Sequence, residues 1–169
     1  MNKVIQRHYE LLKKSTNMTK LKIISLNCNG LALKEKQSFL ITTLKQLKAD
    51  VILLQETHLS SLPDWEGGAT YDFNNNRSGG TAILCDSKYN IKLTNTLKSE
   101  DGRICTADIK IADLSFRLIN CYAPNEPKAR ISFIKETLPS YLSLSIKNIV
   151  GGDFNCAENL KLDTSRPYF

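Results

Sequence analysis

The sequence lacks any apolar run long enough to span a membrane, and its first residues are too polar for a secretory signal. It also lacks a Cys-x-x-Cys pair, so its cysteines do not predict a zinc site. The five cysteines lie in or beside apolar runs or just after one: Cys28, Cys85, Cys105, Cys121 and Cys156. We interpret all five as reduced core thiols. These features predict an intracellular protein, in the nucleus or the cytoplasm, with no membrane partner.

Acidic residues are fewer than basic ones. The chain has 17 Asp and Glu residues against 23 Lys and Arg residues, which gives a net charge of +6 at pH 7. A basic surface favours a polyanionic partner such as nucleic acid, although many soluble proteins are slightly basic. The 169 residues suffice for one domain with its own core. We predict a leader over residues 1–17, with a helical pattern, and the domain over residues 18–169.

The first part of the domain predicts a strand, a helix and a second strand. Leu21–Leu26 and Val51–Gln55 are short apolar runs, and Leu40, Leu44 and Leu47 recur at helical spacing between them. A unit of this kind makes its two strands parallel, so their carboxyl ends share one edge of the sheet. Open α/β sheets bind ligands at that edge.

The middle of the chain predicts an antiparallel meander. Four apolar segments follow one another between turn-like residues: Thr81–Cys85, Asn90–Leu97, Arg103–Ile111 and Ser115–Tyr122. In the third segment, apolar and polar residues alternate with the period of a half-buried strand, which places Cys105, Ala107 and Ile109 on the inner face.

A second helix and a last strand follow the meander. Asn125 is predicted to cap the helix, with Pro127 in its first turn, and Pro139 to end or kink it. Helical spacing predicts a buried face made of four residues: Ile131, Ile134, Leu138 and Leu142. The strand that follows leads into Asp153 and Asn155.

Polar residues therefore stand at the ends of four predicted strands: Asn27, Glu56, Tyr122, and Asp153 with Asn155. A carboxylate such as Glu56 suits Mg²⁺, which would polarise a phosphoryl oxygen. Asp153 can orient or activate a water. The amide and phenol groups can donate hydrogen bonds to phosphate oxygens without adding negative charge. Each residue alone is also what an ordinary loop places after a strand, so the prediction depends on the set.

Five motifs give these residues a family context. They occur in the order SLNCNGL (25–31), LLQETHL (53–59), GGTAIL (79–84), INCYAPN (119–125) and GGDFN (151–155). Together they resemble the endonuclease/exonuclease/phosphatase superfamily over about residues 21–166, and more narrowly the apurinic-type endonuclease domain of non-LTR (LINE-type) retrotransposons. The resemblance implies an α/β fold, a two-sheet β-sandwich flanked by helices. It also implies a DNA endonuclease that uses Mg²⁺, or Mn²⁺ in its place, and that is fused to a reverse transcriptase in the complete element.

The resemblance also implies roles for individual residues. These are metal binding by Glu56 and Asn27, catalysis by Asp153, Asn155 and Tyr122, and phosphate or DNA contact by Asn29 and Asn125. His58 follows the QET, where repair enzymes of the superfamily usually carry lysine, and this favours the retrotransposon branch.

The chain departs from the family in one motif. Relatives carry a later Ser-Asp-His motif, whereas the two histidines here are His8 and His58, outside any such motif. The resemblance therefore predicts a sandwich that is incomplete at its C-terminus and little or no cleavage by these 169 residues alone. Two alternatives from the same superfamily stay open: an exonuclease III-like apurinic repair nuclease and a phosphatase of small phosphates. A third alternative is a non-catalytic basic fragment that binds nucleic acid weakly.

Overall fold

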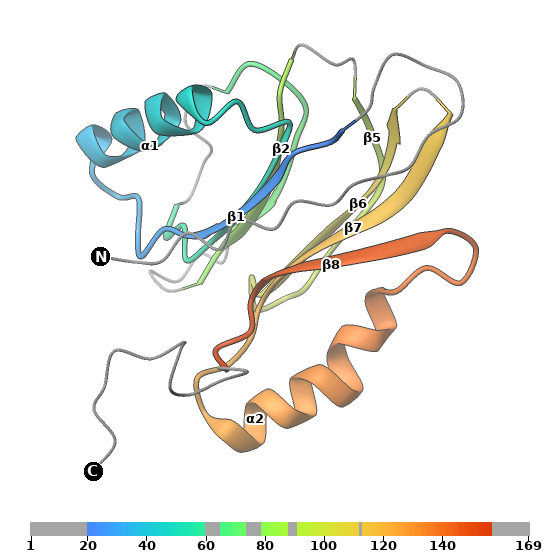
Figure 1. The fold of residues 1–169 in the computed structure, drawn as a ribbon. Helices are drawn as coiled ribbons and strands as arrows, with labels where there is room; N and C mark the ends of the chain where they lie inside the picture. The colour runs from blue at the N-terminus through green and yellow to red at the C-terminus, as the bar shows by residue number, and fades with distance from the viewer. Residues whose placement is uncertain (1–19, 60–64, 74–78, 88–90, 112, 157–169) are drawn as a thin grey trace.

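Two β-sheets pack face to face, with helices on their outer faces, in the computed structural model of the chain (Figure 1). The structure describes residues 20–59, 65–73, 79–87, 91–111 and 113–156. The leader predicted over residues 1–17, and the domain boundary after it, lie outside the described residues. The described part confirms the predicted α/β, two-sheet architecture. None of its helices is long and apolar enough to cross a membrane.

The first sheet contains the predicted strand, helix, strand unit. Its strand order is β1(Ile23–Asn27), β2(Val51–Gln55), β4(Thr81–Cys85), β3(Ala69–Asp72). β1 and β2 are parallel, as predicted, with Asn27 opposite Gln55. The helix α1(Lys34–Gln46) covers the outer face of this sheet, and its Leu44 is buried against Ile24 and Ile52. The prediction for this unit is confirmed.

The second sheet is the predicted meander with one change. Its order is β5(Lys92–Lys98), β6(Ile104–Ile111), β7(Leu114–Tyr122), β8(Lys147–Asp153), with the last pair parallel. The prediction that Thr81–Cys85 also belongs to this meander is wrong. That segment is β4 of the first sheet, where all five of its residues are buried. A strand that is apolar along its whole length fits between two cores, whereas the meander strands keep a polar face.

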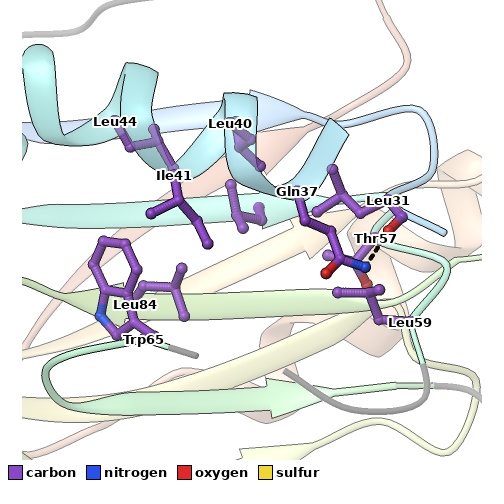
Figure 2. Close-up of a pocket in the computed structure, with 10 residues that line it drawn as sticks. Leu31, Gln37, Leu40, Ile41, Leu44, Thr57, Leu59, Trp65 and Leu84 are labelled. Atoms are coloured by element: carbon purple, nitrogen blue, oxygen red, sulfur yellow. Dashed lines mark hydrogen bonds between the residues drawn. The ribbon is translucent and has the colours of Figure 1, made fainter. Parts of the chain in front are cut away.

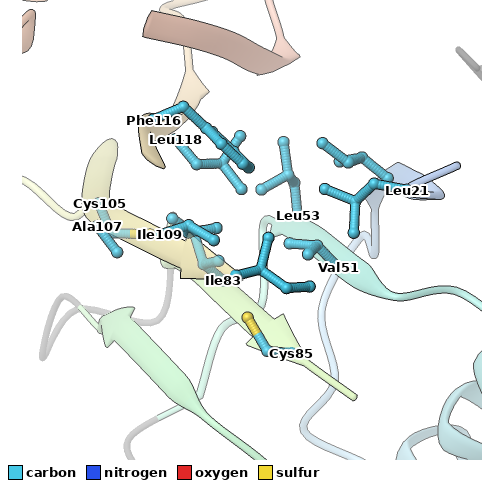
Figure 3. Packing of buried hydrophobic residues seen from close by; sticks show 12 residues of the cluster. Leu21, Val51, Leu53, Ile83, Cys85, Cys105, Ala107, Ile109, Phe116 and Leu118 are labelled. Carbon is cyan, nitrogen blue, oxygen red and sulfur yellow. The ribbon is translucent and has the colours of Figure 1, made fainter. Parts of the chain in front are cut away.

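The main core lies between the two sheets (Figure 3). Cys105, Ala107 and Ile109 of β6 point into it, as their alternation predicts, and meet Val51 and Leu53 of β2. The four cysteines in the strands and the first loop are free and buried: Cys28, Cys85, Cys105 and Cys121. Burial raises the pKa of each of these thiols to about 12, which makes them unreactive. Cys156 is exposed, so its prediction as a core thiol is wrong.

The second helix differs from its prediction in cap and register. α2(Pro127–Ser132) is capped by Glu126, whose carboxylate accepts hydrogen bonds from two main-chain nitrogens, and not by Asn125. The helix continues as a π-helical turn, η1(Phe133–Thr137), and a 3₁₀ turn, η2(Leu138–Tyr141), so it ends two residues after Pro139.

This change of helix type explains which residues are buried. Phe133 and Leu138 face the second sheet, five residues apart, and the main-chain N–H of Leu138 donates to the oxygen of Phe133, which is the hydrogen-bond spacing of a π-helix. The spacing of 3.6 residues predicted a face that also included Ile131, Ile134 and Leu142, and those three are exposed. Of the predicted face, only Leu138 is buried.

A buried polar bridge links the sheets directly behind the ends of β2 and β7. The Asn120 side chain is fully buried, and its Nδ2 donates to the main-chain oxygens of Leu54 (2.8 Å) and Ala82 (2.9 Å). Its Oδ1 accepts a hydrogen bond of 2.6 Å from Nε2 of Gln55, which is also buried. The bridge therefore joins strands β2 and β4 of the first sheet to strand β7 of the second.

We expect Asn120→Ala to lower the free energy of unfolding by about 3 kcal/mol, because it removes three buried hydrogen bonds that link the two sheets. Chemical denaturation measures this directly. The matched control is Asn125→Ala, at an exposed asparagine before α2, which should cost less than about 1 kcal/mol. Equal losses for the two variants would show that the bridge does not stabilise the sandwich.

Candidate active site at the carboxyl ends of four strands

Four strand ends meet at one edge of the sandwich. β1 and β2 form one parallel pair and β7 and β8 form the other, and both pairs end on the same side. Asn27, Tyr122 and Asp153 are the last residues of β1, β7 and β8, and Glu56 follows β2. The two sheets thus bring together residues that are up to 126 positions apart in the sequence.

Asn27 links the two carboxylates of the site. Its Nδ2 donates one hydrogen bond of 2.8 Å to Oε1 of Glu56 and another of 2.8 Å to Oδ2 of Asp153. Its Oδ1 accepts a hydrogen bond of 2.9 Å from the main-chain nitrogen of Asn29. An amide group has only two N–H donors, and Asn27 uses both of them to hold two acidic groups side by side.

Tyr122 lies against the same glutamate. Its side chain is largely buried. Burial is the main cause that raises the pKa of this phenol, and the interaction with the Glu56 carboxylate raises it further. Tyr122 therefore stays a neutral hydrogen-bond donor at neutral pH.

Asp153 and Asn155 are held by the main chain around them. Oδ1 of Asp153 accepts a hydrogen bond of 2.9 Å from the Asn155 nitrogen, so both carboxylate oxygens have partners. The Asn155 Nδ2 donates to the oxygen of Ala123 at 2.6 Å, and the Ala123 nitrogen donates to the oxygen of Asp153 at 2.8 Å. These bonds extend the pairing of β7 with β8 and fix the orientation of the Asp153 carboxylate.

The backbone of the site is strained. Glu56, Asn29 and Asn155 have positive φ angles of 50°, 48° and 49°. Asparagine tolerates this conformation, but for a glutamate it is unusual and costs on the order of 1–2 kcal/mol. Such strain concentrates where a side chain must be aimed at a ligand. Here it turns the Glu56 side chain toward Asn27 and Tyr122.

The two residues predicted to contact phosphate or DNA lie at the rim of the site. Asn29 is exposed and its main-chain oxygen accepts a hydrogen bond of 2.8 Å from Nζ of Lys36. Asn125 is exposed as well, and its main-chain oxygen accepts a hydrogen bond of 2.9 Å from Arg130. Within the described residues, the hydrogen bonds of the site involve only main-chain atoms of Asn29 and do not involve the Asn125 side chain.

The sequence analysis missed two cations beside the site. Lys36 reaches it from the start of α1, and Arg103 reaches it from the turn before β6, with Cζ 5.0 Å from the centre of the Tyr122 ring. The sequence separates both from the motifs that the analysis used, and only the packing of the sheets makes them neighbours. His58 lies nearby, with Nε2 4.0 Å from Oε2 of Glu56.

The donor set fits a magnesium-type ion better than a zinc ion. Two carboxylates, Glu56 and Asp153, stand beside one amide, and Mg²⁺ prefers one or two carboxylates with several waters. Zinc sites use three or four side chains of the His, Cys and carboxylate types. The described residues contain no group of three or more His, Cys, Asp or Glu placed to hold a metal. Glu56, with Asn27 beside it, is the side chain that would hold the ion.

A separate small cavity under α1 belongs to the packing of the fold. It measures about 10 Å³ and is lined mainly by apolar side chains, among them Leu44, Trp65 and Leu84 (Figure 2). Gln37 closes one end with a hydrogen bond of 2.6 Å from its Nε2 to the oxygen of Leu31. This space is enough for about one water molecule and not for a substrate. The open strand edge, and not this cavity, is therefore the candidate site.

Comparisons with known proteins agree with this fold, but they do not assign a function to any individual residue. Residues 24–162 match the model of the Endonuclease/Exonuclease/phosphatase family. The chain is 26% identical over 144 residues to the Transposon TX1 uncharacterized 149 kDa protein of Xenopus laevis, which covers 80% of this chain and 11% of that protein.

Two solved structures have a similar fold. One is D. rerio TDP2 complexed with a single-strand DNA product, with a TM-score of 0.61 and 18% identity over 82% of this chain and 62% of that one. The other is an AP endonuclease from Archaeoglobus fulgidus, with a TM-score of 0.58 and 22% identity over 82% of this chain and 59% of that one. This chain thus spans less than two thirds of either structure and a small part of the transposon protein.

Proposed function

The chain belongs to the endonuclease/exonuclease/phosphatase family, and we propose that it is a metal-dependent phosphodiester hydrolase domain of the retrotransposon type, which acts on DNA. The observation that carries this proposal is the bridge from Asn27 to both Glu56 and Asp153. It joins a metal-binding carboxylate to a second carboxylate that can act on water. The basic charge of the chain and the similarity to a transposon protein of Xenopus laevis support DNA as the substrate.

Each residue then has a defined task. Glu56, with Asn27 beside it, would hold Mg²⁺ or Mn²⁺, which would supply a positive charge to polarise a phosphoryl oxygen. Asp153 accepts a proton from the attacking water, and the bonds from Asn27 and Asn155 aim its carboxylate. Tyr122 and the Asn155 amide donate hydrogen bonds to phosphate oxygens, which stabilise the charge that develops there. Asn29 and Asn125, at the rim, contact the neighbouring backbone of the DNA.

A single-turnover nicking assay on supercoiled plasmid, with protein in excess and with Mg²⁺ or Mn²⁺, tests this function. These conditions also test the expectation that the 169 residues alone show little or no cleavage, because protein in excess detects a small residual rate. We expect Asp153→Asn to slow cleavage by about 100-fold or more, because it removes the base and keeps the shape. Its matched control is Asp113→Asn, at an exposed aspartate in the turn between β6 and β7, which should cut like the wild type.

Two outcomes of this assay would count against the proposal. Cleavage by the Asp153→Asn variant at the wild-type rate would show that Asp153 takes no part in the cleavage reaction. A wild-type chain that neither nicks the plasmid nor binds DNA more tightly with metal would favour the non-catalytic alternative. A DNA duplex with one abasic site tests the alternative of an apurinic repair nuclease. A repair nuclease cuts at that site preferentially, whereas the proposed domain should show no such preference.

A further inference from the structure

Arg103 is attached to Tyr122 at three points. The main-chain nitrogen of Tyr122 donates to the oxygen of Arg103 at 2.8 Å. The Arg103 Nη1 donates to the oxygen of Tyr122 at 3.2 Å. The guanidinium carbon lies 5.0 Å from the centre of the phenol ring, which is within the range of a cation–π contact. One arginine thus contacts both the backbone and the ring of a single residue of the site.

The other side of Arg103 is held by the turn that precedes β6. Its main-chain nitrogen donates to Oγ of Ser99 at 2.9 Å and to Oδ1 of Asp101 at 3.2 Å. Its Nε lies 3.5 Å from Oδ2 of Asp101. The Arg103 side chain is nevertheless 30% exposed, so this ion pair adds little stability. The turn therefore presents the guanidinium to Tyr122 in a defined orientation and leaves part of it open to solvent.

We propose that Arg103 is a positioning residue. It holds the ring of Tyr122 so that the phenol hydroxyl, which lies beside Glu56, can donate a hydrogen bond to a substrate phosphate. This inference rests on the proposed function. The phenol group of Tyr122 interacts with the Glu56 carboxylate in this structure, and a metal ion held there would compete for the same oxygens. A ring that could swing would then leave the site, whereas a ring fixed by Arg103 keeps its hydroxyl beside the phosphate.

The chemistry of the contact favours an arginine. A planar guanidinium can lie over a ring and donate to a carbonyl oxygen in one fixed geometry, whereas a lysine ammonium is a point charge on a flexible chain.

The test uses two ligands, Mn²⁺ alone and a fluorescein-labelled DNA duplex with Mn²⁺ present. We expect Arg103→Met to weaken DNA affinity about 10-fold and to change Mn²⁺ affinity less than about 2-fold, because Arg103 does not hold the metal residues. Arg103→Lys should recover part of the DNA affinity. The control for net charge is Lys110→Met, on an exposed residue of β6, which should change DNA affinity less than about 2-fold.

A double-mutant cycle with Tyr122→Phe separates positioning from direct contact. If Arg103 acts through the Tyr122 hydroxyl, Arg103→Met should have less than about a 2-fold effect once that hydroxyl is gone. An undiminished 10-fold effect in the Tyr122→Phe background would overturn the proposal, because Arg103 would then bind phosphate by itself. Equal losses of Mn²⁺ and DNA affinity in Arg103→Met would overturn it too, as a purely structural role. Failure of the proposed function would differ from both, since the wild type would then show no metal-stimulated DNA binding.

Discussion

Glu56→Gln should abolish measurable Mn²⁺ binding and, with it, any residual single-turnover DNA cleavage. The substitution keeps an oxygen that can accept the hydrogen bond from Asn27, so the local fold should survive. It removes the negative charge that a hard cation requires. Residues that act as one catalytic unit lose most of their effect when one member is removed, so no other residue of the site should compensate.

Electron paramagnetic resonance of Mn²⁺ measures binding without turnover, and the nicking assay measures the rate. The matched control is Glu66→Gln, at an exposed glutamate before β3, which should behave like the wild type in both. Unchanged Mn²⁺ affinity in Glu56→Gln would show that the metal, if bound, is held elsewhere. The assignment of Glu56 would then be wrong, whatever the DNA assay gave.

Gly152→Ala should unfold the end of β8 or lower the free energy of unfolding by about 4 kcal/mol. Gly152 has a φ angle of +143°, and a Cβ atom there would lie 1.9 Å from the main-chain oxygen of Cys121. Backbone atoms of a paired strand cannot move aside without breaking the pairing of β7 with β8, so steric overlap adds to the conformational strain. Asp153 follows directly, and any shift of β8 therefore moves the proposed base.

Thermal and urea unfolding of Gly152→Ala measure the loss of stability. Gly68→Ala is the matched control, because its Cβ would meet only ordinary contacts at 3.5 Å or more. That variant should stay within about 1 kcal/mol of the wild type. A Gly152→Ala protein as stable as the control would mean that β8 does not pair with β7 as closely as the structure has it.

The sequence predicts the parts of the fold that depend on local pattern. The β1, α1, β2 unit and the parallel direction of its strands follow from periodicity and spacing alone. The wrong assignments have non-local causes. β4 joins the first sheet because both of its faces can be buried there. The buried face of the second helix shifts because a π-helical turn, with hydrogen bonds between residues five apart, has more residues per turn than the 3.6 of an α-helix.

The same distinction between local pattern and non-local packing applies to the candidate site. Strand ends and motifs identify Asn27, Glu56 and Asp153, because polar residues after apolar runs are visible in the sequence. The hydrogen bonds from one amide to two carboxylates depend on how the sheets face each other, and no spacing rule gives that. The contact of Arg103 with Tyr122 is also hidden, since it arises from the pairing of β6 with β7.

The most direct test of the central claim is the position of a bound metal ion. Crystals of the chain soaked in Mn²⁺ give an anomalous difference map that locates the ion without any assumption about activity. The account predicts a peak within coordination distance of a Glu56 carboxylate oxygen, next to Asn27, and no such peak in crystals of Glu56→Gln. A peak at another group of residues, or the same peak in both crystals, would contradict the claim that these strand ends form a metal-dependent hydrolase site.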